Sequence, residues 1–176
     1  MQHAQLASAS TEFFAQPTAD FCDEYPDAQV LQGRYESFAA LTRCAGRVET
    51  VSTRDDNSQV KAVLAEPGDG RVLFVDNSAS LNCAMLGGDL AQMAARSGWA
   101  GIIINGAVRD VEELRETKVA VFALGTCPRK SIKRGFGSRG IPVRVAGTLI
   151  QPNDIIAADA DGVVVLASWG ANRPHV

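Results

Sequence analysis

The sequence predicts an α/β fold with mixed sheets around a central β-α-β unit. Two short apolar runs, 71–76 and 101–105, are typical of buried strands. Between them, residues 81–97 place apolar side chains at three- and four-residue steps, as an amphipathic helix does. From Ile141 onward the pattern changes to short strands separated by turns. The 176 residues, of which 46% are hydrophobic, suffice for one domain over 1–176.

Before this unit, the chain has the pattern of a helix, a strand and a second helix. Thr18 is a candidate N-cap for a helix over 18–25. Residues 46–53 alternate between apolar and polar, which predicts a strand. The polar run 55–58 is typical of a helix N-terminus, and apolar residues recur after it at helical spacing. The helix ends at 66–70, which contains a proline and two glycines.

Within the unit, residues 77–80 are expected to form the turn before the central helix. After it, we expect a short helix over 111–116, a strand over 119–124 and a long surface loop over 126–140. Residues 1–10 are expected to be flexible, as are 169–176. The last predicted strands are 143–146, 148–150, 154–157 and 163–167.

Composition excludes several classes of function. The net charge of −3 argues against a nucleic-acid partner. One basic cluster lies within 126–140, and we interpret it as a solvated loop, with a surface for an anionic partner as the alternative. No run of 18 apolar residues exists, so no membrane span is expected. The four cysteines form no CxxC pair, which favours reduced thiols in a cytoplasmic protein. The basic cluster comprises Arg129, Lys130, Lys133, Arg134 and Arg139.

Histidine is nearly absent, which restricts the chemistry further. The only two histidines are His3 and His175, close to the two ends. Histidine-dependent triads and the usual zinc sites are therefore not expected. Any catalysis must rely on carboxylates, arginine, lysine and water, with or without an oxygen-liganded metal.

Two pairs of residues flank the β-α-β unit and are candidates for a binding site. Gly87 and Gly88 let the backbone approach a ligand closely, and a helix that begins near them would offer free amides to an anion. Alternatively, they only interrupt the helix or allow close packing. Arg109 and Asp110 follow a parallel strand, where open α/β sheets bind ligands.

Arginine suits bidentate recognition of a carboxylate, and aspartate is a hard ligand for Mg²⁺ or Mn²⁺. Glu113 lies one helical turn after Asp110, on the same face. In the alternative interpretation, Asp110 caps the short helix, Glu113 completes a capping box and Arg109 forms a solvated ion pair. From residue chemistry alone, this helix-cap interpretation is the favoured one.

A longer pattern favours the binding-site interpretation over the helix cap. Gly88, twenty residues, Arg109, Asp110, two residues and Glu113 resemble the Gly-x20-Arg-Asp-x2-Glu/Asp motif of one family. That family comprises the 4-hydroxy-4-methyl-2-oxoglutarate aldolases and the RraA-like proteins, whose namesake regulates ribonuclease E. The similarity covers about residues 12–168. It includes the segments 18–23, 66–76, 98–110, 145–148 and 158–165.

The resemblance implies a swivelling β/β/α domain that forms a homotrimer or a hexamer, with sites between subunits. By position, the backbone at Gly87, Gly88, Asp89 and Leu90 would line a pyruvate moiety, and Arg109 would bind its oxygens. Asp110 would ligate Mg²⁺ or Mn²⁺, with Glu113 in a supporting role. The general base is not identified by the motif; our hypothesis is a water molecule held by the metal or by a carboxylate, for which Asp89 is a candidate.

The implied activity is that of a metal-dependent class II aldolase, a lyase. It would cleave 4-hydroxy-4-methyl-2-oxoglutarate and related 4-carboxy-4-hydroxy-2-oxo acids to pyruvate and a 2-oxo acid, and it would also decarboxylate oxaloacetate. The alternative is a non-catalytic regulator that binds and inhibits ribonuclease E. Such regulators lack the aspartate after the arginine, which this chain keeps as Asp110. A methyltransferase is not favoured, because Gly87-Gly88 is not a GxGxxG motif.

Overall fold

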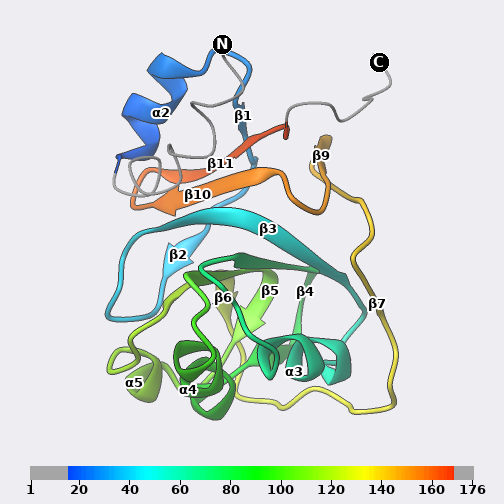
Figure 1. Cartoon of the computed structure of the whole chain (residues 1–176). Coiled ribbons are helices and arrows are strands. Elements are labelled where there is room, and N and C mark those ends of the chain that lie inside the picture. Colours follow the sequence, from blue (N-terminus) through cyan, green and yellow to red (C-terminus); the bar gives the residue numbers. More distant parts are fainter. Residues whose placement is uncertain (1–15, 169–176) are drawn as a thin grey trace.

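A computed structural model describes residues 16–168, and in this part a nine-stranded sheet and a separate two-stranded hairpin form the framework (Figure 1). The helices are α2 (Thr18–Glu24), α3 (Ser58–Leu64), α4 (Gly88–Arg96) and α5 (Val111–Leu114). The first six strands are β1 (Gln29–Val30), β2 (Glu36–Ser37), β3 (Cys44–Ser52), β4 (Val72–Leu86), β5 (Gly101–Val108) and β6 (Ala120–Thr126). The others are β7 (Ser138–Arg139), β8 (Val143–Val145), β9 (Thr148–Ile150), β10 (Ile155–Asp159) and β11 (Gly162–Leu166). Both histidines and the two segments expected to be flexible, 1–10 and 169–176, lie outside the described residues.

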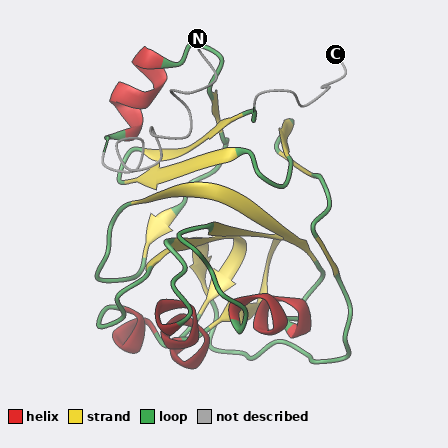
Figure 2. Ribbon diagram, in the orientation of Figure 1, coloured by secondary structure: helices red, strands yellow, loops and turns green. Residues whose placement is uncertain are grey.

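The four strands β3, β4, β5 and β6 are parallel and adjacent in chain order, and α3, α4 and α5 connect them. Figure 2 shows these three helices together below the sheet. Along each strand, successive residues face opposite sides of the sheet. Val75 and Ile104 face the helices, whereas Phe74 and Ile103 face the other layer. Because both faces are covered, these strands are continuous apolar runs. Each such buried side chain contributes roughly 1.5–3 kcal/mol.

The second layer is antiparallel and consists of β1, β11, β10 and β3, so that β3 belongs to both layers. Phe74, Phe122 and Ile156 belong to the core between the layers. Helix α2 covers the outer face of β10 and β11, where Phe21 packs against Ala157 and Val164. The β/β/α arrangement expected from the sequence is therefore confirmed. Among residues 16–168, no helix is long and apolar enough to cross a membrane.

The predicted central helix over 81–97 is wrong in its first part, because β4 continues to Leu86 and α4 begins at Gly88. Residues 77–80 are not a turn that ends the strand but an excursion within it. Strand β4 returns to pair with β5, with Ala84 opposite Ala107 and Leu86 opposite Val108. The apolar spacing was compatible with a helix, but pairing with a distant strand decided the structure. Gly98 ends α4 as expected, with a positive φ of 79°.

Thr18 does not cap α2, because Pro17 occupies the N-cap position and Thr18 is the first helical residue. Its hydroxyl donates instead to the Asp159 carboxylate at 2.6 Å, which fastens α2 to the end of β10. The other predicted elements are present with ends shifted by a few residues. Strands β1, β2 and β7 were not predicted, since two residues are too short to produce a pattern.

The segment over 126–140 is a long connection, as predicted, and a buried carboxylate is among the groups that fix it to the body, together with the pairing of β7 with β3. Asp56 is fully buried, and it accepts hydrogen bonds from the amides of Ser58 at 2.8 Å, Arg134 at 2.6 Å and Phe136 at 3.3 Å. Burial by itself would raise the pKa of Asp56, but these hydrogen bonds lower it to about 2. The basic cluster is also partly neutralised, because Arg139 pairs with Glu66 at 2.6 Å.

We predict that Asp56→Asn lowers the free energy of unfolding at pH 7 by about 2–4 kcal/mol, because an amide cannot accept from all three backbone groups. The folded-state pKa lies below the unfolded value of about 3.9, so this stabilisation is complete above that value. It is lost as pH falls from about 4 through about 2. Urea unfolding of both proteins at pH 7 and pH 3 measures the difference.

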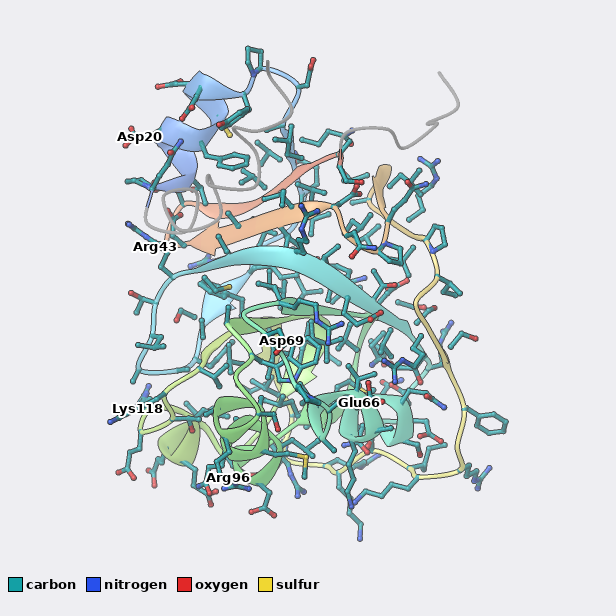
Figure 3. All side chains as sticks on the ribbon, in the orientation of Figure 1. Asp20, Arg43, Glu66, Asp69, Arg96 and Lys118 are labelled. Carbon is teal, nitrogen blue, oxygen red and sulfur yellow. The ribbon has the colours of Figure 1, made fainter. Side chains whose placement is uncertain are left out.

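The matched control is Asp69→Asn, since Asp69 is an exposed acid labelled in Figure 3. Its φ of 50° is a conformation that asparagine tolerates. We expect a change within about 0.5 kcal/mol for this variant. If Asp56→Asn were no less stable than Asp69→Asn, the assigned role of the Asp56 carboxylate would be wrong.

Candidate functional site

The site predicted from the sequence lies where two neighbouring parallel strands end. Leu86, the last residue of β4, pairs with Val108, the last residue of β5. The segments that follow these two strands therefore leave the sheet side by side. The Arg109 amide donates to the Leu86 carbonyl at 3.0 Å. This register places Gly87 next to Arg109, although 21 residues lie between them in the sequence.

Gly87 and Gly88 are required by close packing. A β-carbon on Gly87 would collide with the Asp110 carboxylate, and one on Gly88 would collide with Glu113. The close-packing interpretation of the two glycines is thus confirmed. It does not exclude a binding role, because the same packing brings the N-terminus of α4 to Asp110.

Asp110 occupies the N-cap position of the four-residue helix α5, but its side chain makes no capping hydrogen bond. Its Oδ2 instead accepts from the Gly88 amide at 3.3 Å and lies 3.4 Å from Nε of Arg109. The helix-cap interpretation therefore holds in part: Asp110 has the N-cap position and Arg109 forms the exposed ion pair, but the capping hydrogen bond of the Asp110 side chain is absent. Asp110 also has a left-handed backbone, with φ of 58°, a conformation that is uncommon for residues other than glycine.

The N-terminus of α4 presents backbone donors beside the Arg109 guanidinium. The Ala91 amide donates to the Gly87 carbonyl at 3.1 Å, which closes the first turn of the helix. The amides of Asp89 and Leu90, within that turn, have no intrahelical acceptor. Free amides, a helix N-terminus and an arginine side chain that is 39% exposed together suit a small carboxylate or keto oxygen.

Asp110 is the candidate metal ligand, and its side chain is 36% exposed. Among residues 16–168, no three Cys, His, Asp or Glu side chains gather so that they could hold a metal ion. A single accessible carboxylate does not fit structural zinc, but it fits Mg²⁺ or Mn²⁺, which retain water molecules and take oxygens from the substrate. Asp89 and Glu113 are both exposed, and neither has a described hydrogen bond to Asp110.

The structure thus brings Gly87, Gly88, Arg109 and Asp110 into direct contact. Glu113 lies against Gly88, while Asp89 and Leu90 follow in the first turn of α4.

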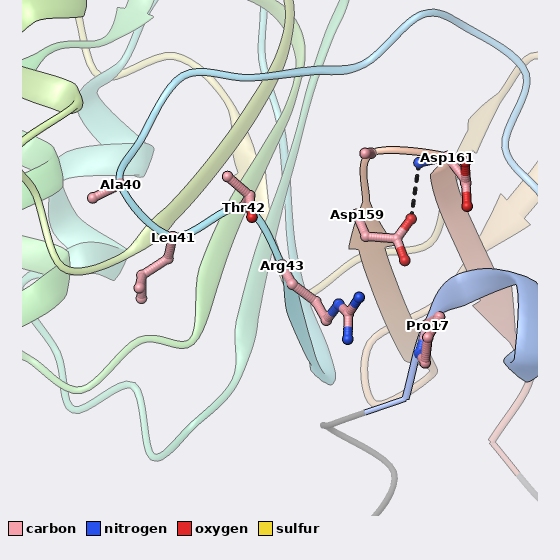
Figure 4. Close-up of a pocket in the computed structure, with 8 residues that line it drawn as sticks. Pro17, Ala40, Leu41, Thr42, Arg43, Asp159 and Asp161 are labelled. Carbon is pink, nitrogen blue, oxygen red and sulfur yellow. Dashed lines mark hydrogen bonds between the residues drawn. The ribbon is translucent and has the colours of Figure 1, made fainter.

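A separate hollow of about 500 Å³ lies at the opposite end of the molecule, between Arg43 and Asp159 (Figure 4). The Asp159 carboxylate is buried and accepts from the amides of Thr18 at 2.8 Å and Asp161 at 3.0 Å. Burial would raise the pKa of Asp159, but the hydrogen bonds from Thr18 and Asp161 hold it below its ordinary value. Since both oxygens of this carboxylate fix the chain, we interpret the hollow as structural.

Comparison with known proteins is consistent with this geometry. The family model described as RraA-like, aldolase/RraA, matches residues 18–165. A 4-hydroxy-4-methyl-2-oxoglutarate aldolase from Thermus thermophilus is 45% identical over 149 residues, which cover 85% of this chain and 91% of that one.

Two solved structures are also similar to the chain. The RNA-processing inhibitor RraA from Thermus thermophilus has a TM-score of 0.84 and 43% identity, covering 89% of this chain and 97% of that one. A Geobacillus kaustophilus protein described as an S-adenosylmethionine:2-dimethylmenaquinone methyltransferase has a TM-score of 0.83 and 37% identity. The match covers 91% of this chain and 100% of that one. The names of these similar proteins describe different activities, so the site must decide between them.

Proposed function

This chain belongs to the RraA-like aldolase/RraA family, and from that premise we propose that it is a divalent-metal-dependent class II aldolase. Its substrates would be 4-hydroxy-4-methyl-2-oxoglutarate and related 4-carboxy-4-hydroxy-2-oxo acids, and its products pyruvate and a second 2-oxo acid. The observation that carries the proposal is the contact of Asp110 with Arg109 and the Gly88 amide, in place of a capping hydrogen bond.

In this proposal, the amides at the start of α4 and the Arg109 guanidinium hold the carboxylate and keto oxygens of the substrate. Asp110 holds the metal, Mg²⁺ or Mn²⁺. When bound, such a metal would supply Lewis-acid chemistry that stabilises the negative charge developing on the substrate. A water molecule, for which Asp89 is the candidate holder, accepts the proton of the C4 hydroxyl as the C3–C4 bond breaks. Arg109 then stabilises the negative charge of the pyruvate enolate, an effect worth several kcal/mol at such sites.

The same arrangement suits a second reaction. Decarboxylation of oxaloacetate also leaves pyruvate enolate, so residues that stabilise this enolate serve both reactions. We therefore propose oxaloacetate decarboxylase activity at the same residues, with no lysine Schiff base. Protonation of the enolate at C3 then gives pyruvate.

A coupled assay of pyruvate release tests the proposal. The protein is stripped with EDTA, then supplied with 4-hydroxy-4-methyl-2-oxoglutarate or oxaloacetate, with and without Mg²⁺ or Mn²⁺. We expect turnover of both compounds only when metal is restored. Turnover that EDTA leaves unchanged, or no turnover of either compound with metal, would contradict the proposal.

We further propose that the active form is a homotrimer or a hexamer, with the site completed between subunits. The side chains of Arg109 and Asp110 are each more than one third exposed in the single chain, which leaves them accessible to a neighbouring subunit. Light scattering coupled to size-exclusion chromatography should give the mass of three or six chains. A monomer with full activity would exclude this assembly.

A protein-inhibitor role is the second candidate, because a solved structure with 43% identity is described as an RNA-processing inhibitor. Under this alternative, the chain would bind ribonuclease E without catalysing a reaction. The metal-binding role that we propose for Asp110 would have no purpose in such an inhibitor, which is why we favour the enzyme. Binding of ribonuclease E, with no metal-dependent release of pyruvate, would reverse the preference.

A further inference from the structure

A second pocket, of about 430 Å³, lies on the other face of the parallel strands from the helices. Asp76 and Asn105 line it from β4 and β5, and Arg144 lines it from the β8–β9 hairpin. By strand alternation, Asp76 and Asn105 point to the same side as Phe74 and Ile103, which face the core between the layers. The pocket does not include the residues of the site described above. Its size is within the range of small-molecule sites.

One wall of this pocket is a carboxylate held in a fixed position. Oδ1 of Asp76 accepts from the Ser78 amide at 2.9 Å and from the Asn105 side-chain amide at 2.9 Å. The Tyr35 hydroxyl in turn donates to Oδ1 of Asn105 at 3.4 Å. Tyr35 and Asn105 are both buried, so this chain of hydrogen bonds is rigid. Oδ2 of Asp76 has no hydrogen-bond partner among residues 16–168, and it remains available to a ligand.

The β8–β9 hairpin adds a positive charge to the lining of this pocket. Nη1 of Arg144 donates to the Gly147 carbonyl at 3.0 Å, which fixes the guanidinium to its own hairpin. Within the described part of the chain, Arg144 and Asp76 do not form an ion pair, although both line the pocket. Two opposite charges therefore line one cavity without pairing with each other. A ligand that carries both a positive and a negative group could form an ion pair with Asp76 and another with Arg144.

The backbone around the pocket is also unusual. Ser78, Ala79 and Ala146 all line it and all have positive φ values, of 54°, 56° and 46°. None of them is a glycine, so each conformation is uncommon and must be held by its surroundings. Such strain persists mainly where a binding site requires it.

We infer that this pocket binds a small zwitterion, of the class of free α-amino acids. The ammonium group of the ligand would donate to Oδ2 of Asp76, and its carboxylate would accept from the Arg144 guanidinium. The inference does not depend on the proposed aldolase activity, because it uses other residues on another face of the sheet. A ligand with only one of the two charges would leave one wall of the pocket unpartnered.

Isothermal titration calorimetry of the full chain with each common amino acid tests this inference. At least one amino acid should bind with one site per chain, and the matching amine and carboxylic acid, each lacking one charge, should bind roughly tenfold more weakly or worse. Asp76→Asn and Arg144→Gln should each weaken binding by a similar factor. Arg144 is exposed, so its variant keeps the result interpretable even if Asp76→Asn does not fold.

Arg109→Ala is the control for location, because it removes the positive charge of the other site and should leave amino-acid binding unchanged. The inference is overturned if no amino acid binds at millimolar concentration. It is equally overturned if Arg144→Gln binds as tightly as the wild type, or if Arg109→Ala abolishes binding. Pyruvate release, measured on the same samples, reports on the aldolase proposal separately.

Discussion

Replacing Asp110 with asparagine should reduce metal-dependent pyruvate release about a hundredfold to a thousandfold while leaving the fold intact. The change keeps the shape of the side chain but removes the charge that would hold the metal, and loss of such charge stabilisation costs several kcal/mol. The fold should survive because asparagine tolerates the left-handed backbone found at Asp110, with φ of 58°. Steady-state rates at saturating Mg²⁺, with thermal unfolding of the same samples, measure both effects.

The matched control for this variant is Glu112→Gln, which removes a negative charge from the neighbouring exposed helix α5 without touching the site. Its rate should stay close to that of the wild type. If Asp110→Asn and Glu112→Gln retained the same activity, Asp110 could not be the metal ligand.

Gly87→Ala should reduce pyruvate release by roughly tenfold to a hundredfold, because the new methyl group takes the place of the Asp110 carboxylate oxygen. The carboxylate is the mobile end of an exposed side chain, so it can move away, and the fold should lose only about 1 kcal/mol. What is lost is the position of the carboxylate relative to Arg109. We expect a weaker apparent affinity for Mg²⁺, measured by titration of the rate with metal.

Gly125→Ala provides the comparison, since a β-carbon on that glycine of β6 would meet only the Leu81 side chain, at 3.8 Å. This is ordinary van der Waals contact, so rate and metal dependence should not change. An unchanged metal dependence in Gly87→Ala would show that the close approach of Gly87 to Asp110 has no role in the site.

The parallel strands were predictable because residues buried on both faces leave long apolar runs, as in 71–76 and 101–105. The strand over residues 81–86 was not predictable, because its apolar spacing suits a helix as well as a strand. Their structure depends on pairing with β5 and on the hydrogen bond from the Ala84 amide to the Arg129 carbonyl. Such contacts join residues far apart in the sequence, and no local pattern records them.

The contacts within the candidate site also depend on residues that are far apart in the sequence. Residue chemistry favoured a helix cap at Asp110, and only the register between β4 and β5 brings its carboxylate to Gly88. The long motif named these residues without giving this contact. In the second pocket, Asp76 and Asn105 are the last residues of two predicted strands. Their position at strand ends was the available signal, but the sequence did not place Arg144 opposite them.

The most direct test of the account is the binding of Mn²⁺ to EDTA-stripped protein with and without pyruvate, followed by electron paramagnetic resonance of free Mn²⁺. If Asp110 and Arg109 form one site for metal and 2-oxo acid, pyruvate should tighten Mn²⁺ binding, and Mn²⁺ should tighten pyruvate binding by the same factor. Asp110→Asn should abolish this coupling. Equal Mn²⁺ binding with and without pyruvate, or full coupling in Asp110→Asn, would contradict the account.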